Sequence, residues 1–131
     1  MRFNYNDGGR SKYFKADKVG DCVTRAIAIA NNMDYKEIYQ MVKVANGKTP
    51  RNGVSKTATR IVMKQLGWTW IPTMTIGSGC QVHLKEDELP KGTIIVQLSH
   101  HVSCIIDGVI NDTYDCSRDG TRCVYGYFIK E

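Results

Sequence analysis

The chain has 131 residues, of which 42% are hydrophobic and 24% charged, with 12 glycines and 3 prolines. This composition is ordinary for a globular protein and excludes disordered, collagen-like and coiled-coil chains. The length of the chain is suited to a single hydrophobic core. We therefore expect a single domain over residues 1–131. No apolar run approaches the roughly 18 residues that span a bilayer, and residues 1–15 are too polar for a signal peptide. We expect an unexported protein without a membrane partner.

The net charge of +5 is spread along the chain without a run of five like charges. A solvated surface explains this pattern as well as a nucleic-acid site does. Trp68 and Trp70 fall on one face of a predicted strand, which favours a place in the core or a groove wall over an exposed stacking platform. Nucleic acid is therefore not the expected partner.

The five cysteines are an odd number in a chain with no export signal. Such usage is typical of reduced thiols in a cytoplasm. The sequence therefore predicts no disulfide framework.

The first half of the chain has the period of amphipathic helices. Apolar residues recur at i, i+3, i+4 and i+7 over residues 22–33, which predicts a central helix. A second helix is predicted over 35–46 after a capping box that starts at Asp34, and a third over 56–66 with Ser55 as its N-cap.

From residue 68 onward the period changes to two, and the segment KEDELPKG before the third strand is expected to be a helical turn or loop. The predicted strands are Trp68 to Ile71, Gln81 to Leu84, Thr93 to Leu98, His101 to Ile106, Val109 to Tyr114, and Arg122 to Ile129. Helices followed by strands indicate an α+β fold, with N-terminal helices packed on a C-terminal antiparallel sheet.

The pair Asp107-Gly108 between two of these strands is a strong signal for a two-residue hairpin. Counting outward from this turn, every second residue shares a face, so Asp112 lies on the face of His101 and diagonal to it. His100 lies on the other face, unless a bulge before Val102 reverses the parity. A histidine oriented by a carboxylate is half of a Cys/His/Asp site, although a structural pair explains the pattern equally well.

Cys22 falls in the first turn of the most apolar helix. A helix N-terminus stabilises a thiolate, the nucleophilic form of cysteine. Free cysteines are also common core residues, so this position alone does not decide between a nucleophile and a packing residue.

The order of features along the chain resembles papain-like cysteine peptidases, in particular the small branch that includes bacteriocin-leader peptidases. A cysteine at a helix start comes first, followed by a helical stretch and then by a sheet in which one strand carries a histidine and the next an aspartate. The hairpin HVSCIIDGVIND is similar to that class. The segments GDCVTRAIAIA, LGWTWIPTM, DELPKGTIIVQLS and DGVINDTYDCSRDGTRCVYGY resemble a family of small bacteriophage proteins, and this likeness covers nearly the whole chain.

The resemblance implies a papain-like fold with Cys22 as nucleophile, His101 as general base and Asp112 as orienting acid, with His100 as the runner-up base. Papain-like peptidases place a glutamine shortly before the nucleophile as oxyanion donor, and ADKVGD contains none. The loop amides at Asp21 and Cys22, or the side chain of Asn6, are the remaining candidates for this role.

Metal binding is the rival use of these residues. The candidate pairs are Cys80 with His83, His101 with Cys104, and Cys116 with Cys123, and they do not make the two closely spaced pairs typical of structural zinc. We therefore expect no metal and no other cofactor.

The favoured interpretation is a bacteriophage cysteine hydrolase or transferase that acts on an amide, isopeptide or thioester bond in the host cytoplasm. Its partner is then a protein or peptide substrate. The alternative is a non-catalytic binding module on the same fold, which antagonises a host defence protein by occupying its surface.

Overall fold

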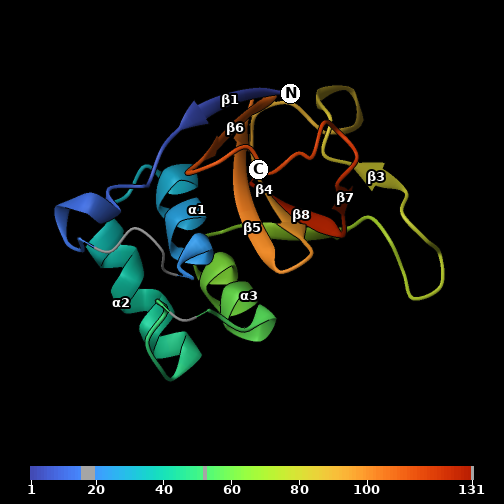
Figure 1. Cartoon of the computed structure of the whole chain (residues 1–131). Coiled ribbons are helices and arrows are strands. Elements are labelled where there is room, and N and C mark those ends of the chain that lie inside the picture. The colour runs from blue at the N-terminus through green and yellow to red at the C-terminus, as the bar shows by residue number, and fades with distance from the viewer. Residues whose placement is uncertain (16–19, 52, 131) are drawn as a thin grey trace.

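The computed structural model describes residues 1–15, 20–51 and 53–130. Its helices are α1 (Cys22–Asn31), α2 (Tyr35–Asn46) and α3 (Lys56–Gln65), with short 3-10 turns η1 (Arg10–Lys12) and η2 (Glu86–Glu88). Its strands are β1 (Arg2–Tyr5), β2 (Thr69–Pro72), β3 (Val82–His83), β4 (Thr93–Leu98), β5 (His101–Ile106), β6 (Val109–Asp112), β7 (Cys123–Val124) and β8 (Gly126–Ile129). The three helices lie on one side of the main sheet (Figure 1).

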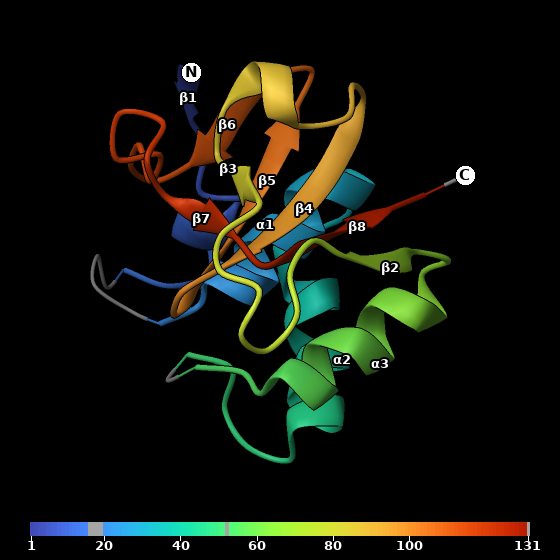
Figure 2. The same cartoon turned by 90° about the vertical axis from the view of Figure 1, so that its right-hand side faces the viewer.

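The main sheet has the strand order β1-β6-β5-β4-β8-β2, and β3 and β7 form a separate two-stranded ribbon. The ribbon lies on the face of the sheet that is turned away from α1 (Figure 2). The α+β class is confirmed. The expectation of a purely antiparallel C-terminal sheet is wrong, because β1 joins its edge and runs parallel to β6. Strand β1 has only four residues, Arg2–Tyr5, and all four are exposed, so its short polar–aromatic alternation does not mark a buried face.

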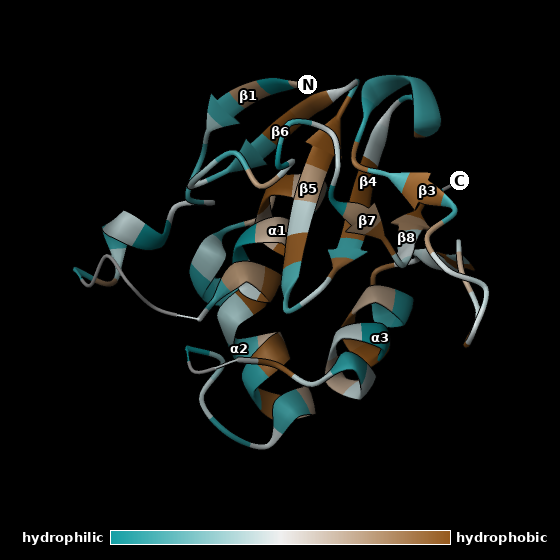
Figure 3. Cartoon of the chain, turned by 45° about the vertical axis from the view of Figure 1, so that its right-hand side comes forward, coloured by the Kyte–Doolittle hydropathy of each residue, from teal (hydrophilic) through white to brown (hydrophobic). Residues whose placement is uncertain are grey.

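Helix α1 is the central helix that the pattern predicts. Val23, Ala26 and Ile27 are at most 4% exposed and pack against Val102 and Cys104 of β5 in the larger of two apolar clusters. Hydrophobic residues are concentrated along β5 and the neighbouring β4 (Figure 3). The second cluster fills the opposite face of the sheet, beneath the β3–β7 ribbon. The start of α1 is thereby held against the middle of the sheet.

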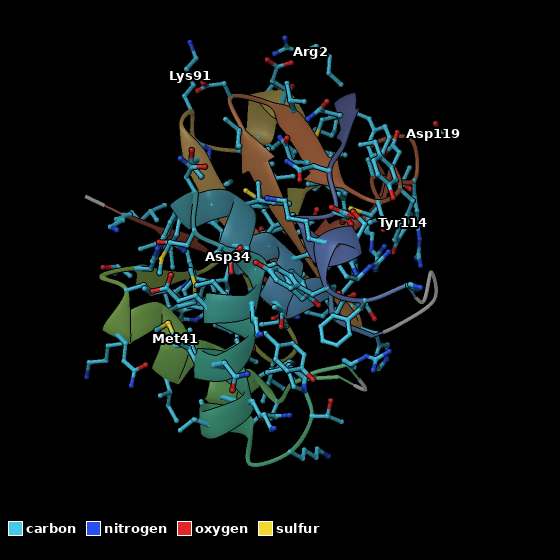
Figure 4. The ribbon with its side chains drawn as sticks, turned by 90° about the vertical axis from the view of Figure 1, so that its left-hand side faces the viewer. Arg2, Asp34, Met41, Lys91, Tyr114 and Asp119 are labelled. Carbon is cyan, nitrogen blue, oxygen red and sulfur yellow. A yellow bond between two sulfur atoms is a disulfide. The ribbon has the colours of Figure 1, made fainter. Side chains whose placement is uncertain are left out.

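The two predicted helix caps have different outcomes. The Ser55 hydroxyl accepts a hydrogen bond from the amide of Ala58 at 3.0 Å, as expected for an N-cap. The capping box at Asp34 is wrong: Asp34 makes no cap bond, and its carboxylate accepts instead from the hydroxyl of Tyr13 at 2.6 Å. The Asp34 side chain therefore connects the start of α2 to the N-terminal segment (Figure 4).

The hairpin between β5 and β6 has the predicted turn and register. Asp107 and Gly108 have φ values of 47° and 79°, and the register places Ile105 opposite Ile110. Strand β6 ends at Asp112, two residues earlier than expected. Past this point the first half of β5 pairs with β4 alone, so the sheet has an open edge there.

Cys80 and Cys123 form a disulfide, which contradicts the expectation that all five thiols are reduced. Their separation of 43 residues carries no pairing signal, and the two cysteines meet only because the loop after β2 folds back onto β7. The remaining thiols, at Cys22, Cys104 and Cys116, are free.

Among the described residues, no helix is long and apolar enough to cross a membrane.

Candidate functional site

The start of α1 is fixed by a buried ionic network around Asp21. The Asp21 carboxylate is fully buried and accepts hydrogen bonds from Arg10 at 3.2 Å, from the Tyr35 hydroxyl at 2.6 Å, and from Arg25 one turn further along α1. These partners offset the cost of burying the charge. They hold Cys22, the first residue of α1, at a defined place above the sheet.

The sequence places a histidine and a carboxylate together on the β5–β6 hairpin, and the structure has this contact. His101 Nε2 lies 2.7 Å from Asp112 Oδ2, and both side chains are more than nine-tenths buried. The same carboxylate accepts from the Ser103 hydroxyl at 2.7 Å, from the Thr113 amide at 2.7 Å, and from Arg25 at 3.3 Å. Asp112 is thus held rigidly, and through it the orientation of the imidazole is fixed.

Cys22 approaches His101 at the open edge of the sheet. Val102 and Cys104 point toward α1, so His101 and Ser103 begin on the opposite face of β5. At this edge, beyond the end of β6, both residues line one cavity, and the imidazole acts on the Cys22 sulfur. His101 Nε2 is bonded to Asp112, which leaves Nδ1 as the nitrogen available to the thiol.

The pKa shifts describe an ion pair between these two residues. Burial alone raises the pKa of the Cys22 thiol. Interactions of the sulfur with His101 and with the amide of Val102 outweigh burial and hold this pKa below its ordinary value. Burial alone lowers the pKa of the His101 imidazole, yet the bond to Asp112 and the nearby sulfurs of Cys116 and Cys22 raise it to about 12. The site therefore favours a thiolate beside an imidazolium, which is the reactive form of a nucleophilic cysteine.

His100 has a different environment. It is exposed, has a φ of 54°, and lies in the two-residue turn Ser99-His100 that joins β4 to β5. The register pairs Leu98 directly with His101, so the bulge that would have reversed the parity is absent from this part of the chain. His100 lines the cavity, but its ring makes no hydrogen bond to a carboxylate among the described residues.

The cavity at Cys22 and His101 has a volume of about 540 Å³. Its lining includes Gln97 of β4, Thr59 of α3 and Tyr125 between β7 and β8, which come from separate parts of the chain and form no motif in the sequence. Gln97 Nε2 donates to the backbone carbonyls of Leu98 at 2.9 Å and of His101 at 3.3 Å. Gln97 therefore supports the turn that presents His101.

The two expected oxyanion donors are not both at the site. The Asn6 carboxamide oxygen accepts from the Gly8 amide, and Asn6 lines a different cavity at the far end of α1. The Asp21 side chain is an acceptor that its three partners already occupy, so only backbone amides remain for this role. As the first residue of α1, Cys22 has an amide without an intrahelical acceptor.

Sequence reasoning considered Cys116 only together with Cys123 and missed its place beside the His101–Asp112 pair. Its sulfur and ligand atoms of His101 and Asp112 lie within 4.8 Å of one another, and all three side chains are buried. These are donor types that zinc accepts, so the trio is the place in the described chain where a metal could bind. None of the pairs considered from the sequence forms such a site: Cys80 is bonded to Cys123, and Cys104 packs on the other face of β5.

The aromatic ring of Tyr114 packs next to the imidazole of His101. Its centroid lies 5.2 Å from that of His101, and Tyr114 is labelled in Figure 4 on the segment that follows β6. The ring of Tyr114 is itself about half exposed and does not line the cavity that Cys22 and His101 share.

Comparison of the chain with protein-family models, with curated protein sequences and with solved structures finds no match in any of the three. The class of protein is therefore defined by the structure itself. It is an α+β domain with a mixed six-stranded sheet that brings a cysteine at a helix start next to a buried histidine–aspartate pair.

Proposed function

We propose that the protein is a cysteine hydrolase or transferase of the papain-like type, acting on an amide, isopeptide or thioester bond of a protein or peptide. The observation that carries the proposal is the 2.7 Å bond from His101 to Asp112 beside a thiol whose pKa is lowered. The resemblance to small bacteriophage proteins adds the proposal that the protein acts inside a host cell.

In this mechanism the Cys22 thiolate attacks the carbonyl carbon of the substrate and forms a tetrahedral intermediate. The backbone amide of Cys22 donates to the developing oxyanion. The His101 imidazolium gives its proton to the leaving amine or thiol, and the acyl group stays on the sulfur as a thioester. His101, now neutral, removes a proton from a water or acceptor amine as that group attacks the thioester and releases Cys22.

Asp112 keeps the imidazole in one orientation and stabilises its charged form during both proton transfers. The guanidinium of Arg25 contacts the other carboxylate oxygen at 3.3 Å and favours the ionised acid. Asp112 thereby acts through His101 and does not touch the substrate.

Labelling of the folded protein with iodoacetamide at neutral pH, followed by mass mapping, tests this proposal. The three free thiols serve as internal controls for one another. We expect Cys22 to react first, whereas Cys104 and Cys116, which are at most 1% exposed, stay unmodified. Failure of Cys22 to react in the folded protein would remove the nucleophile from the proposal.

A binding module without chemistry predicts a different result. In that case the Cys22→Ser variant would keep the full effect of the protein on its target, because only the surface matters. The hydrolase or transferase proposal expects Cys22→Ser to lose the effect while retaining the fold by circular dichroism.

A further inference from the structure

The cavity at Cys22 does not end at the catalytic pair. A second cavity of about 550 Å³ adjoins it, and the two are lined in common by Lys56, Thr59, Gln97 and Tyr125. The two cavities therefore lie next to each other, and together we call them the cleft. One half lies at Cys22 and His101, and the other half lies between α3 and the edge of the sheet formed by β8 and β2.

The far half of the cleft has aromatic and apolar walls. The rings of Trp70 and Phe128 lie with their centroids 4.9 Å apart. Gly126 allows this packing, because a Cβ at that position would collide with the Trp70 ring. Met74 and the fully exposed Ile76, both from the loop after β2, line the other side. An exposed apolar side chain at the mouth of an apolar cavity is a place for a partner's apolar group.

Positively charged side chains line the cleft: Lys56 lies on the wall that both halves share, and Arg60 lies in the apolar half. Lys56 and Arg60 come from consecutive turns of α3, both are exposed, and neither forms an ion pair among the described residues. The Arg60 guanidinium lies 5.1 Å from the centroid of the Trp70 ring. Among the described residues that line the two cavities there is no aspartate or glutamate. The cleft is therefore complementary to a negatively charged group next to an apolar one.

We propose that this cleft binds an extended peptide that carries a large apolar side chain and a neighbouring acidic side chain. The apolar side chain enters the half lined by Trp70 and Phe128, and the acidic side chain lies near Lys56 and Arg60. The peptide then continues toward Cys22. The assignment of the peptide as substrate rests on the proposed function, whereas its binding does not require any reaction.

Nucleic acid would also bring negative charge to aromatic rings. The structure favours a peptide because Trp70 is only partly exposed, is packed against Phe128 and is covered by Arg60, so it offers no free face for a base. The cleft also opens onto a thiol, whose chemistry suits acyl groups.

The experiment measures the binding of short capped peptide amides to the Cys22→Ser variant by isothermal titration calorimetry. The probes are acetyl-Glu-Phe-Gly amide and acetyl-Phe-Glu-Gly amide, each compared with the version that carries Lys for Glu and with the version that carries Ser for Phe. We expect at least one Glu/Phe peptide to bind about tenfold more tightly than either of its altered versions.

Charge-reversal variants test which side chains produce the preference for Glu over Lys in the peptide. The double variant Lys56→Glu/Arg60→Glu should lose the preference for Glu over Lys and keep the preference for Phe over Ser. Its matched control is Lys43→Glu/Lys64→Glu, which reverses two exposed lysines on α2 and α3 that line neither cavity. The control should leave both preferences unchanged.

The outcomes separate this inference from the proposed function. If iodoacetamide fails to label Cys22 but the Cys22→Ser variant still prefers Glu/Phe peptides, the chemistry is wrong and the cleft assignment stands. If Cys22 is labelled but the peptides bind without preference, or an oligothymidylate displaces them, the cleft assignment is overturned.

Discussion

The Asp112 carboxylate is shared between a histidine and an arginine. One oxygen accepts from His101 at 2.7 Å, and the other contacts Arg25 at 3.3 Å. Burial raises the pKa of this acid, and the bonds from His101 and Ser103 outweigh burial and hold it below its usual range. The carboxylate thus stays ionised and keeps His101 protonated next to Cys22.

The thiolate of Cys22 should depend on His101 and not on His100. Replacement His101→Ala removes the imidazolium and leaves burial to raise the pKa of the thiol, so the alkylation rate at pH 6 should fall at least about tenfold. The measurement is the rate of reaction with iodoacetamide against pH. His100→Ala is the matched control, because His100 is the adjacent residue and lines the same cavity. The reverse pattern would show that His100 is the partner of the thiol.

His101 should also make stability depend on pH once the thiol is absent. In the native chain folding raises its pKa from 6.5 to about 12, and Asp112, which contributes more to this rise than Cys22 does, remains when the thiol is removed. The stabilising effect of His101 is therefore complete below pH 6.5 and is lost as the pH rises through the folded pKa. In the native chain a second group offsets this loss of stability. The Cys22 thiol is deprotonated in the folded protein, whereas the unfolded chain keeps this proton up to about pH 9.

In the Cys22→Ala variant, therefore, the free energy of unfolding should fall between pH 6.5 and 8 by up to about 1.4 kcal/mol per pH unit. Urea denaturation at several pH values measures this slope. The double variant Cys22→Ala/His101→Gln should show no such fall. A flat profile for Cys22→Ala would contradict an imidazolium in the folded state.

At the scale of elements, the ionic network at the start of α1 connects this helix to the N-terminal segment, to α2 and to the sheet. Asp21 contacts Arg10 and Tyr35, and Arg25 continues the network to Asp112 of β6. Three segments outside α1 therefore fix the position of its first turn.

Removal of the central acid should be costly. Asp21→Ala leaves Arg10 buried without its partner and leaves Arg25 with Asp112 alone, and the free energy of unfolding should fall by about 3–5 kcal/mol. Tyr35→Phe removes only one hydrogen bond from the same carboxylate and should cost about 1–2 kcal/mol. Asp34→Ala, at an exposed aspartate, should change stability little. Urea denaturation of the three variants tests this order, and equal effects of Asp21→Ala and Asp34→Ala would contradict it.

Elements with a strong local signal were predicted from the sequence. The apolar period located α1, the cap at Ser55 located α3, and the Asp107-Gly108 turn gave the register that brings His101 to Asp112. Strand β1 was missed because an exposed strand at a sheet edge is recognised only by its partner β6. The contact of Cys116 with His101 and Asp112 was missed because it depends on how the loop after β6 returns to β5. The bonds of Gln97 are local, but a glutamine within a strand gives no sequence signal for them.

For the whole molecule, the β3–β7 ribbon and the cleft are joined by the disulfide. Cys80 ends the loop that carries Met74 and Ile76, and its bond to Cys123 connects this loop to β7. Cys123 also lies 3.8 Å, sulfur to sulfur, from Met74. The disulfide therefore supports one wall of the apolar half of the cleft, on the far side from Cys22.

Loss of the disulfide should lower stability and weaken peptide binding without changing the thiol chemistry. It closes a loop over a separation of 43 residues, for which chain entropy predicts a stabilisation of about 4 kcal/mol. The double variant Cys80→Ser/Cys123→Ser should unfold at a lower urea concentration than the native protein. Reductant should lower the unfolding midpoint of the native protein to that of the variant and should leave the midpoint of the variant unchanged. Because Cys22 and His101 are held by α1 and β5, iodoacetamide should label Cys22 at the native rate in both proteins. Two results would contradict this role of the disulfide: five free thiols in non-reducing peptide mapping, or an unfolding midpoint of the native protein that does not change with reductant. The loop after β2 would then be held by its other contacts alone, which include the hydrogen bond that the Thr73 hydroxyl donates to the carbonyl of Val124 at 2.6 Å.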